Sequence, residues 1–380
     1  MSSKLGVSSS SCLPPMNPPY GDWICTSSLS TSFSCTLVCD PGWIIQGRST
    51  LTCEGGNWTD PGINFGCTAV EAVMIAGNSY DSADIEALKT AEIYGQYHGR
   101  DIQMEVARLS EQRTDATLNY VNSQVLMCGG WGGGRKTCSR FYPDSGTGSW
   151  NETYALSEQY IGRETHMSVI LGDKLYLIGG DNEPKTTEYI EACKSTTAQP
   201  GISLASESYR GCAVSISHDT FVVAGGASSD CGNSHYSCGK RTVIAYNITS
   251  KSHYELPSLR YARMDHDCVM YRDRKTEDMF ILVTGGRYEG ESAMGNTEML
   301  RVGGRAWEQV GDLNYARSHL ALAVLEKKIL AIGGLFNRKP TDIVEEFDFA
   351  SKTWKITKRM LYPRYGHAVT EIPSDISNSC

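Results

Sequence analysis

Short apolar runs that end in two glycines, or in one case in Gly-Asn, recur along the chain at a nearly constant spacing. Five runs end in Gly-Gly and the first ends in Gly-Asn. They begin at Val73, Val125, Leu175, Phe221, Ile281 and Ile329. The successive intervals are 52, 50, 46, 60 and 48 residues. This period predicts stacked supersecondary units, because one unit of about 50 residues cannot bury its own apolar face.

A second repeating mark lies 15 to 22 residues before each Gly-Gly pair. It is an arginine that opens a further stretch rich in apolar residues, such as RETHMSVI. These arginines are Arg113, Arg163, Arg210, Arg263 and Arg317. The first run has no such stretch before it, and a surplus one led by Arg364 follows the last run. We expect these stretches to be innermost strands, with the C-terminal one completing the first unit.

Aromatic pairs complete the pattern. In four repeats an aromatic or apolar residue precedes an aromatic one by seven or eight positions: Tyr142/Trp150, Tyr246/Tyr254, Leu300/Trp307 and Phe347/Trp354. With these marks, residues 70–373 resemble the kelch family. The resemblance implies an all-β, six-bladed β-propeller, in which each Gly-Gly run is a second strand and the aromatic pairs anchor the third and outer strands against the neighbouring blade. Closure by the C-terminal strand protects the sheet edges.

The N-terminal part is rich in cysteine. Six of the 14 cysteines lie within residues 12–67, together with Pro14-Pro15, an Asp-Pro-Gly-Trp segment after Cys39, and Trp58. This segment resembles the sushi module in its six-cysteine form, a binding or spacer unit. The resemblance implies the disulfides Cys12–Cys53, Cys39–Cys67 and Cys25–Cys35. Such constraints suit 56 residues, which cannot bury a large core. The segment has no Cys-x-x-Cys pair and no histidine, so we expect no zinc site there.

Eight cysteines remain for the propeller, and their pairing stays open. Cys231 and Cys238 lie in one loop and could bridge it. Cys128 and Cys138 flank a hairpin, and Cys212 and Cys268 lie on innermost strands of adjacent blades. Cys193 and Cys380 are left over.

The cysteine count predicts an oxidising compartment, and three sequons agree with it. Their acceptors are Asn57, Asn151 and Asn247. Residues 1–11 are rich in serine and lack the apolar core of a signal peptide, so we expect a truncated or misplaced start; residues 374–380 form a tail. The formal charge of −8 argues against a nucleic-acid partner. No apolar run is long enough to span a bilayer.

Recognition is expected on the loops that join second to third strands. Trp131 and Tyr288 are the aromatic candidates there. The six arginines allow two readings: a basic ring that grips carboxylates, or a packing feature of the repeat shared by His166, His266, His319 and His367. No catalytic motif, metal set or cofactor site is evident.

The sequence therefore predicts a secreted, non-enzymatic protein that binds a protein or glycan. Two alternatives stay open. One is a copper oxidase resembling galactose oxidase, and the other is an intracellular kelch adaptor for a ubiquitin ligase.

Overall fold

The computed structural model describes most of the propeller and parts of the N-terminal segment. The described residues are 12, 15–18, 21–25, 34–39, 43–46, 50–54, 57–59, 66–70, 72–78, 89–97, 100–143, 147–156, 162–228, 238–273, 276–290, 292–325, 328–373 and 376. The regular elements within them are all β-strands. The all-β prediction is therefore confirmed.

The cysteine-rich segment forms a four-stranded sheet and a separate strand pair. The sheet has the order β1 (Gly21–Cys25), β2 (Ser34–Cys39), β4 (Thr50–Glu54) and β5 (Asn57–Trp58), and β3 (Trp43–Gln46) pairs with β6 (Gly66–Ala69). Its disulfides join Cys12 to Cys53, Cys25 to Cys35 and Cys39 to Cys67. The small core consists of the buried Trp23, Cys35, Leu37 and Leu51. So few buried residues leave much of the constraint to the disulfides.

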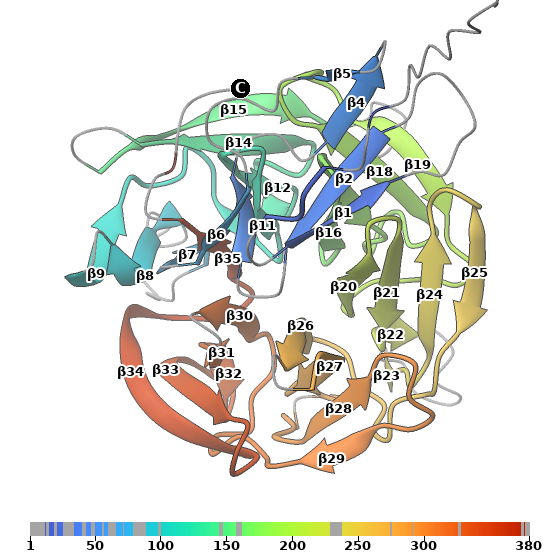
Figure 1. Ribbon diagram of the computed structural model, residues 1–380. Helices are drawn as coiled ribbons and strands as arrows, with labels where there is room; N and C mark the ends of the chain where they lie inside the picture. The colour runs from blue at the N-terminus through green and yellow to red at the C-terminus, as the bar shows by residue number, and fades with distance from the viewer. Residues whose placement is uncertain are drawn as a thin grey trace, which may run out of the picture.

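Six antiparallel sheets follow, which we number as blades in the order of their Gly-Gly runs (Figure 1). Blade 1 contains β35 (Ala368–Ile372), β7 (Ala72–Ala76), β8 (Ala91–Tyr97) and β9 (Arg100–Val106). Blade 2 contains β11 (Thr117–Val121), β12 (Gln124–Cys128), β14 (Thr137–Tyr142) and β15 (Ser149–Ala155). Blade 3 contains β16 (Met167–Leu171), β17 (Lys174–Ile178), β18 (Thr186–Glu191) and β19 (Gln199–Ser203).

Blades 4 to 6 repeat this arrangement. Blade 4 contains β20 (Cys212–Ser217), β21 (Thr220–Ala224), β24 (Val243–Asn247) and β25 (Ser252–Glu255). Blade 5 contains β26 (Asp267–Asp273), β27 (Asp278–Thr284), β28 (Thr297–Arg301) and β29 (Glu308–Val310). Blade 6 contains β30 (Ala321–Leu325), β31 (Lys328–Ile332), β33 (Lys339–Asp348) and β34 (Thr353–Arg364), with the short β32 (Leu335–Phe336) also on β33. In every blade the apolar run before the paired glycines is the second strand, as predicted.

The C-terminal strand closes the ring. β35 pairs with β7 in blade 1, from Ala368 opposite Ala76 to Ile372 opposite Ala72. The innermost strands then contact one another all the way round, in the order β35, β11, β16, β20, β26, β30 and back to β35. Figure 1 shows the resulting circle of sheets.

Apolar side chains pack between neighbouring blades, and three tryptophans add hydrogen bonds there. Trp150 Nε1 donates to Ala107 O (2.9 Å), Trp307 Nε1 to Pro257 O (2.7 Å) and Trp354 Nε1 to Thr297 Oγ1 (2.8 Å). Each tryptophan thus fixes an outer strand against the preceding blade, as the aromatic pattern predicts. Tyr254 is an exception. Its side chain on the edge strand β25 is 50% exposed, so the anchoring role predicted for it is wrong.

The cysteine-rich module lies against one end of the channel. β6 runs almost directly into β7 through Val70, which is buried. Ile44 of β3 packs against the cores of blades 1 and 6. Val38 and Cys39 of β2 line the channel itself. In Figure 1, β1 and β2 cross the ring next to β16. The module therefore covers the face formed by the turns between first and second strands.

Candidate functional site: the loop face and channel mouth

Five of the six predicted arginines are buried in the blades. Arg113, Arg163, Arg263, Arg317 and Arg364 have no exposed surface. Four of them donate to the carbonyl of the first residue of the glycine pair in their own blade: Gly129 (2.8 Å), Gly179 (2.6 Å), Gly285 (2.9 Å) and Gly77 (2.8 Å). Arg317 donates instead to the carbonyls of Ile343 (2.8 Å) and Ala331 (3.1 Å).

A buried glutamate on the third strand neutralises four of these arginines. The pairs are Arg163–Glu188, Arg263–Glu298, Arg317–Glu345 and Arg364–Glu92. The glutamates also accept backbone N–H groups, as Glu298 does from Arg260 and Tyr261. Both charged groups of each pair are buried and lie against each other, so their side chains are not exposed to a ligand. Of the two readings that the sequence left open, the packing feature therefore fits these five arginines, which stabilise the blades.

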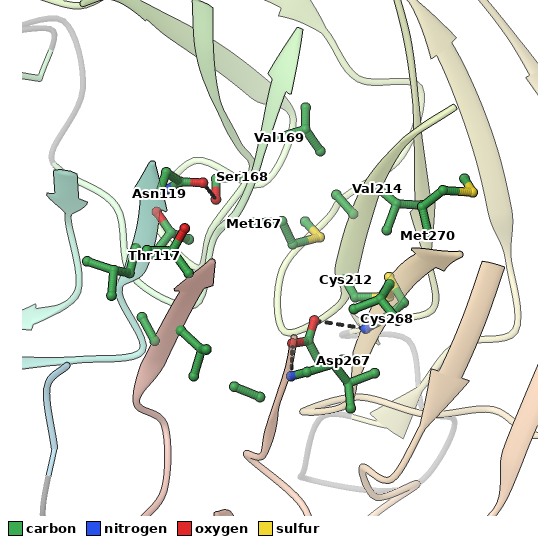
Figure 2. Close-up of a pocket in the computed structure, with 18 of the residues that line it drawn as sticks. Thr117, Asn119, Met167, Ser168, Val169, Cys212, Val214, Asp267, Cys268 and Met270 are labelled. Carbon is green, nitrogen blue, oxygen red and sulfur yellow. Dashed lines mark hydrogen bonds between the residues drawn. A yellow bond between two sulfur atoms is a disulfide. The ribbon is translucent and has the colours of Figure 1, made fainter. Parts of the chain in front are cut away.

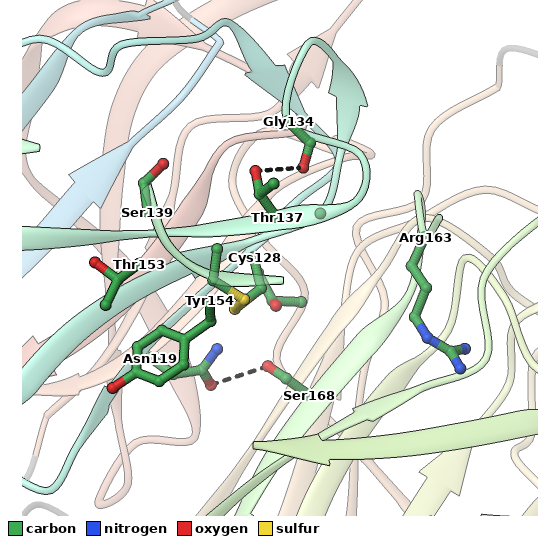
Figure 3. Close-up of a disulfide and its surroundings, with 12 residues drawn as sticks. Asn119, Cys128, Gly134, Thr137, Ser139, Thr153, Tyr154, Arg163 and Ser168 are labelled. Atoms are coloured by element: carbon green, nitrogen blue, oxygen red, sulfur yellow. Dashed lines mark hydrogen bonds between the residues drawn. A yellow bond between two sulfur atoms is a disulfide. The ribbon is translucent and has the colours of Figure 1, made fainter. Parts of the chain in front are cut away.

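Blade 2 has no such glutamate. Ser139 occupies the equivalent position on β14, and Arg113 instead contacts the carbonyls of Gly134 and Thr137 and the hydroxyls of Thr137 and Ser139. Figure 3 shows Gly134 and Thr137 next to the disulfide Cys128–Cys138, which joins β12 to β14. Desolvation by burial lowers the pKa of Arg113 to about 10. The glycine-rich loop after Gly130 thus supplies carbonyl oxygens where other blades supply a buried carboxylate, and the exposed Glu152 lies 3.7 Å from Arg113 Nη2.

Blade 4 departs further from the repeat. The N–H of Gly180 donates to Ser208 O, just as that of Gly130 donates to Arg163 O. Ser208 therefore occupies the arginine position of blade 4, and Arg210 lies two residues later. The prediction that Arg210 is equivalent to the other five is wrong. A disulfide between Cys212 and Cys268 ties this blade to blade 5 (Figure 2).

Arg210 belongs instead to a second ring, at the mouth of the channel. One residue from each blade adopts a left-handed φ near +54°: Asp115, Thr165, Arg210, Asp265, His319 and Gly366. Each N–H donates to the carbonyl of the preceding member, and Asp115 N donates to Gly366 O, with distances of 2.7 to 3.0 Å. The hydrogen bonds form a complete circle. This mouth ring joins the segments that precede the six innermost strands through backbone hydrogen bonds.

The side chains of the mouth ring form a charge network. Arg210 lies 3.4 Å from Asp181 and 3.5 Å from Asp265. Asp265 also accepts from Arg287 Nε (2.6 Å) and lies 3.4 Å from His319 Nε2. The side chain of Arg210 is 29% exposed. It is thus the one predicted arginine at the surface of this face, and it is already paired.

Asp115 is one of four members of the mouth ring that sequence reasoning missed, with Thr165, Asp265 and Gly366. Its carboxylate makes no hydrogen bond or ion pair within the described part of the chain. Burial raises its pKa to about 7, and the nearby charge of Asp265 acts in the same direction. A polar residue two positions after Arg113, Arg163, Arg263 and Arg317 was a recurring signal that could have found it.

The histidines also divide between the two arrangements. His166, His266 and His367 are buried, and their rings lie against Gly129, Gly225 and Gly333, where a Cβ atom would clash. Burial lowers the pKa of each to about 3. These three are packing residues of the repeat. His319 is one register position earlier and belongs to the mouth ring.

The channel below the mouth has a volume of about 500 Å³. Its walls are the free edges of the innermost strands, whose N–H groups need partners. Asp267 accepts from Leu322 N (2.7 Å) and Cys268 N (2.8 Å), and Glu371 accepts from Val324 N (2.7 Å). Figure 2 shows the two bonds of Asp267. These buried carboxylates therefore join neighbouring blades.

The two aromatic candidates are exposed on fixed backbone. Trp131 is 53% exposed and Tyr288 is 51% exposed. Trp131 lies in β13 (Trp131–Gly132), which pairs with β10 (Arg113–Thr114). Tyr288 O accepts from Gly239 N (2.7 Å). They come from blades 2 and 5, on opposite sides of the ring.

The remaining predictions concern cysteines, sequons and metals. Cys193 and Cys238 are also disulfide-bonded, whereas Cys231, the predicted partner of Cys238, lies outside the described residues. Asn57 and Asn151 are exposed, and Asn247 is half-buried. Among the described side chains no group of three His, Cys, Asp or Glu could hold a metal ion.

The comparisons identify both modules. The family model of the sushi repeat (SCR repeat) matches residues 12–67, and that of the kelch motif matches residues 316–361. The chain contains a sushi repeat and kelch repeats. Families of this kind consist mostly of binding modules, and kelch and sushi modules imply protein partners. No helix in the described part of the chain is long and apolar enough to cross a membrane.

Similarity to whole proteins is partial. The chain is 25% identical over 194 residues to Kelch-like protein 38 of Rattus norvegicus, which covers 50% of this chain and 32% of the relative. It is 35% identical over 95 residues to Alpha-scruin of Limulus polyphemus, covering 23% of this chain and 10% of the relative. The chain thus spans a third or less of these relatives, which supports the repeat and protein binding but no specific activity.

Proposed function

We propose that this protein acts outside the cell and binds a protein partner through the loop face of its propeller. The observation that carries the proposal is the presentation of Trp131 and Tyr288. Both aromatic side chains are about half exposed, and both stand on hydrogen-bonded backbone. Exposed aromatics on a preset backbone are typical binding hot spots, because little conformational entropy is lost on association.

The opposite face supports the same choice. There the sushi module covers the end of the channel, so the residues at that end contact Val38, Cys39 and Ile44. The sushi module therefore covers the centre of the opposite face, which favours the loop face as the side that meets the partner. A glycan ligand is the second candidate, since an exposed tryptophan also suits stacking on a sugar ring.

The extracellular location rests on the cysteines. Five disulfides join described residues, and Cys193 and Cys238 are bonded as well. Disulfides of this number persist in oxidising compartments. The intracellular adaptor alternative requires reduced thiols. Free-thiol titration of the native protein separates the two locations, and we expect less than one reactive thiol per chain.

A binding screen tests the function. The full chain, secreted from eukaryotic cells, is screened against arrays of extracellular protein domains and of glycans. Trp131→Ala and Tyr288→Ala are compared with Tyr254→Ala, which removes an equally exposed aromatic from an outer strand. We expect a protein ligand whose binding falls at least tenfold in the first two variants and stays unchanged in the third. A ligand that depends on none of the loop-face residues would place the site elsewhere.

A further inference from the structure

Cys193 is disulfide-bonded, and the fold limits which cysteine can be its partner. It lies in the exposed turn that follows β18 in blade 3. Beyond the five disulfides described above, three cysteines remain as partners: Cys231, Cys238 and Cys380. Cys238 is bonded as well, whereas Cys231 and Cys380 lie outside the described residues. Which of the three can reach Cys193 depends on the face of the propeller from which each one comes.

The turn that carries Cys193 lies on the face that the sushi module covers. Asn122, in the turn between the first two strands of blade 2, donates through Nδ2 to Ala192 O (3.4 Å) and to Asp173 O (3.1 Å). Asp173 is in the corresponding turn of blade 3. Cys193 N also donates to the hydroxyl of Tyr154 on β15 (3.3 Å). These contacts fix Cys193 on this face, at the junction of blades 2 and 3.

Cys238 lies on the opposite face. It belongs to β23 (Cys238–Gly239), which pairs with β22 (Ala227–Ser228) directly after the glycine pair of blade 4. Strand β18, with six residues, spans about 16 Å between the two faces, whereas the two Cα atoms of a disulfide lie within about 7 Å of each other. Cys193 and Cys238 are therefore not bonded to each other. Within one chain, one of them pairs with Cys231 and the other with Cys380.

The C-terminal segment decides between these two pairings. Ile376 packs against the core between blades 1 and 2. Cys380 follows it by four residues, a reach of at most about 14 Å. Cys193 lies one blade further on, and neighbouring sheets pack about 10 Å apart. Cys238 lies across the ring in blade 4 and on the other face (Figure 1). The reach of the segment therefore suits Cys193 and not Cys238.

We propose that Cys193 and Cys380 form a disulfide that fastens the C-terminal segment across blade 2 to blade 3. Formation of this bond removes two electrons and two protons from the two thiols. A disulfide of an oxidoreductase in the secretory compartment accepts them through thiol–disulfide exchange and becomes a dithiol. The inference rests on the proposed extracellular location and is independent of the binding role of the loop face.

The bond acts as a covalent latch on the ring. Strand β35 closes the ring with only five residues, and terminal strands fray unless they are tied down. The latch lies on one side of β35 and the buried pair of Arg364 and Glu92 lies on the other, so the closing strand is held at both ends. We therefore expect the latch to oppose local opening of blade 1 more than that of the other blades.

Peptide mapping of the full chain, alkylated without reduction, tests the pairing. Because trypsin cleaves after lysine and arginine, residues 186–194 should be released joined to residues 365–380. Residues 211–240, which contain the other two candidate partners, should be joined to residues 264–272 alone through Cys212–Cys268. A link between 365–380 and 211–240, or an alkylated Cys380, overturns the pairing.

A double variant tests the latch. In Cys193→Ser with Cys380→Ser we expect backbone N–H groups of β35 to exchange about tenfold faster and the unfolding temperature to fall. Cys231→Ser with Cys238→Ser is the matched control, because it removes a disulfide from the loop face of blade 4 and should leave exchange in β35 unchanged. Wild-type exchange in β35 of the folded double variant overturns the latch.

The same alkylation separates this inference from the proposed location. If only Cys193 and Cys380 are alkylated in the native protein, the latch is refuted and the extracellular location stands. If the cysteines of the sushi module are alkylated as well, both are refuted. Binding in the domain screen is judged by Trp131→Ala and Tyr288→Ala, and neither substitution changes the peptide map.

Discussion

Gly134 packs directly over the guanidinium group of Arg113, so that a Cβ atom on Gly134 would lie 2.0 Å from Arg113 Cζ. The contact exists because blade 2 has Ser139 where four other blades have a buried glutamate. Backbone carbonyls take the place of the missing carboxylate, and only a residue without a side chain allows them to approach. The glycine cluster thus allows the loop to approach Arg113 in the blade that has no buried glutamate.

We therefore predict that Gly134→Ala destabilises the protein by about 1–3 kcal/mol, the usual range for an overpacked buried site. Gly295→Ala is the control, because its nearest contact would be 3.3 Å and its backbone, like that of Gly134, is not left-handed. Chemical denaturation of the two variants measures the difference. Equal stability of both would show that the loop can move away from Arg113.

The buried arginine–glutamate pairs predict a large effect of single substitutions. Glu298→Ala leaves the charge of Arg263 uncompensated in the core, and we expect a loss of about 3–5 kcal/mol in the free energy of unfolding. Replacing both residues, as in Arg263→Met with Glu298→Leu, should cost less than Glu298→Ala alone. Glu277→Ala, which breaks the exposed pair with Arg272, should cost at most about 1 kcal/mol. If the losses in the free energy of unfolding from the two single substitutions add up to the loss in the double variant, the assignment of Arg263 and Glu298 as an ion pair is wrong.

The sequence could predict the blades but not the purpose of the arginines. The Gly-Gly runs locate the second strands because they recur once per structural unit, and such a spacing can be read directly from the sequence. An arginine recurring with that period looks the same whether it faces a ligand or the next strand. The sequence could not fix the register of Arg210 either. Because the loops vary in length, Ser208 and Arg210 both lie at a sequence distance from Gly225 that suits the arginine position. Asp115 shares a recurring polar position two residues after an arginine, but the charges around its carboxylate come from other blades and are brought together only by the fold.

The raised pKa of Asp115 predicts a pH dependence of stability. Its neighbours are Asp265, Arg210, Asp181 and Glu164, of which only Arg210 favours the ionised form. The folded pKa of about 7 lies above the ordinary value of 3.8, so the folded state binds the proton more tightly. Stability from this group is fully present below pH 3.8 and is lost as the pH rises through 7.

Accordingly, Asp115→Asn should match the wild type near pH 4 and exceed it at pH 8, by an amount on the order of a few kcal/mol. Thermal unfolding of both proteins between pH 4 and pH 8 measures this. Glu255→Gln, on the exposed strand β25, should show no such trend. A variant less stable than the wild type at pH 8 would mean that Asp115 has a structural partner.

The disulfides of the propeller should differ in their effect on stability. Cys212–Cys268 closes a sequence separation of 56 residues and joins two blades, whereas Cys128–Cys138 closes 10 residues within one blade. Chain entropy alone gives about 4 kcal/mol for the first and about 3 kcal/mol for the second. We expect Cys212→Ser with Cys268→Ser to be the more destabilising pair. In this variant, hydrogen exchange should rise mainly in blades 4 and 5. A rise confined to blade 2 would contradict the stabilising role of Cys212–Cys268.

The three sequons should differ in occupancy in the secreted protein. Asn57 and Asn151 are exposed, but Asn247 Nδ2 donates to Asp219 Oδ2 (2.9 Å) and Thr220 Oγ1 (3.0 Å). A glycan would replace one of those two hydrogens and place a sugar against Asp219. The side-chain oxygen of Asn247 also accepts from Thr249 N and Ser250 N, which fixes the turn before β25.

We predict glycans on Asn57 and Asn151 and none on Asn247, measured by glycopeptide mass spectrometry. We also predict a loss of stability in Asn247→Gln but not in Asn151→Gln. Full occupancy of Asn247 in a stable protein would show that the turn forms without these bonds.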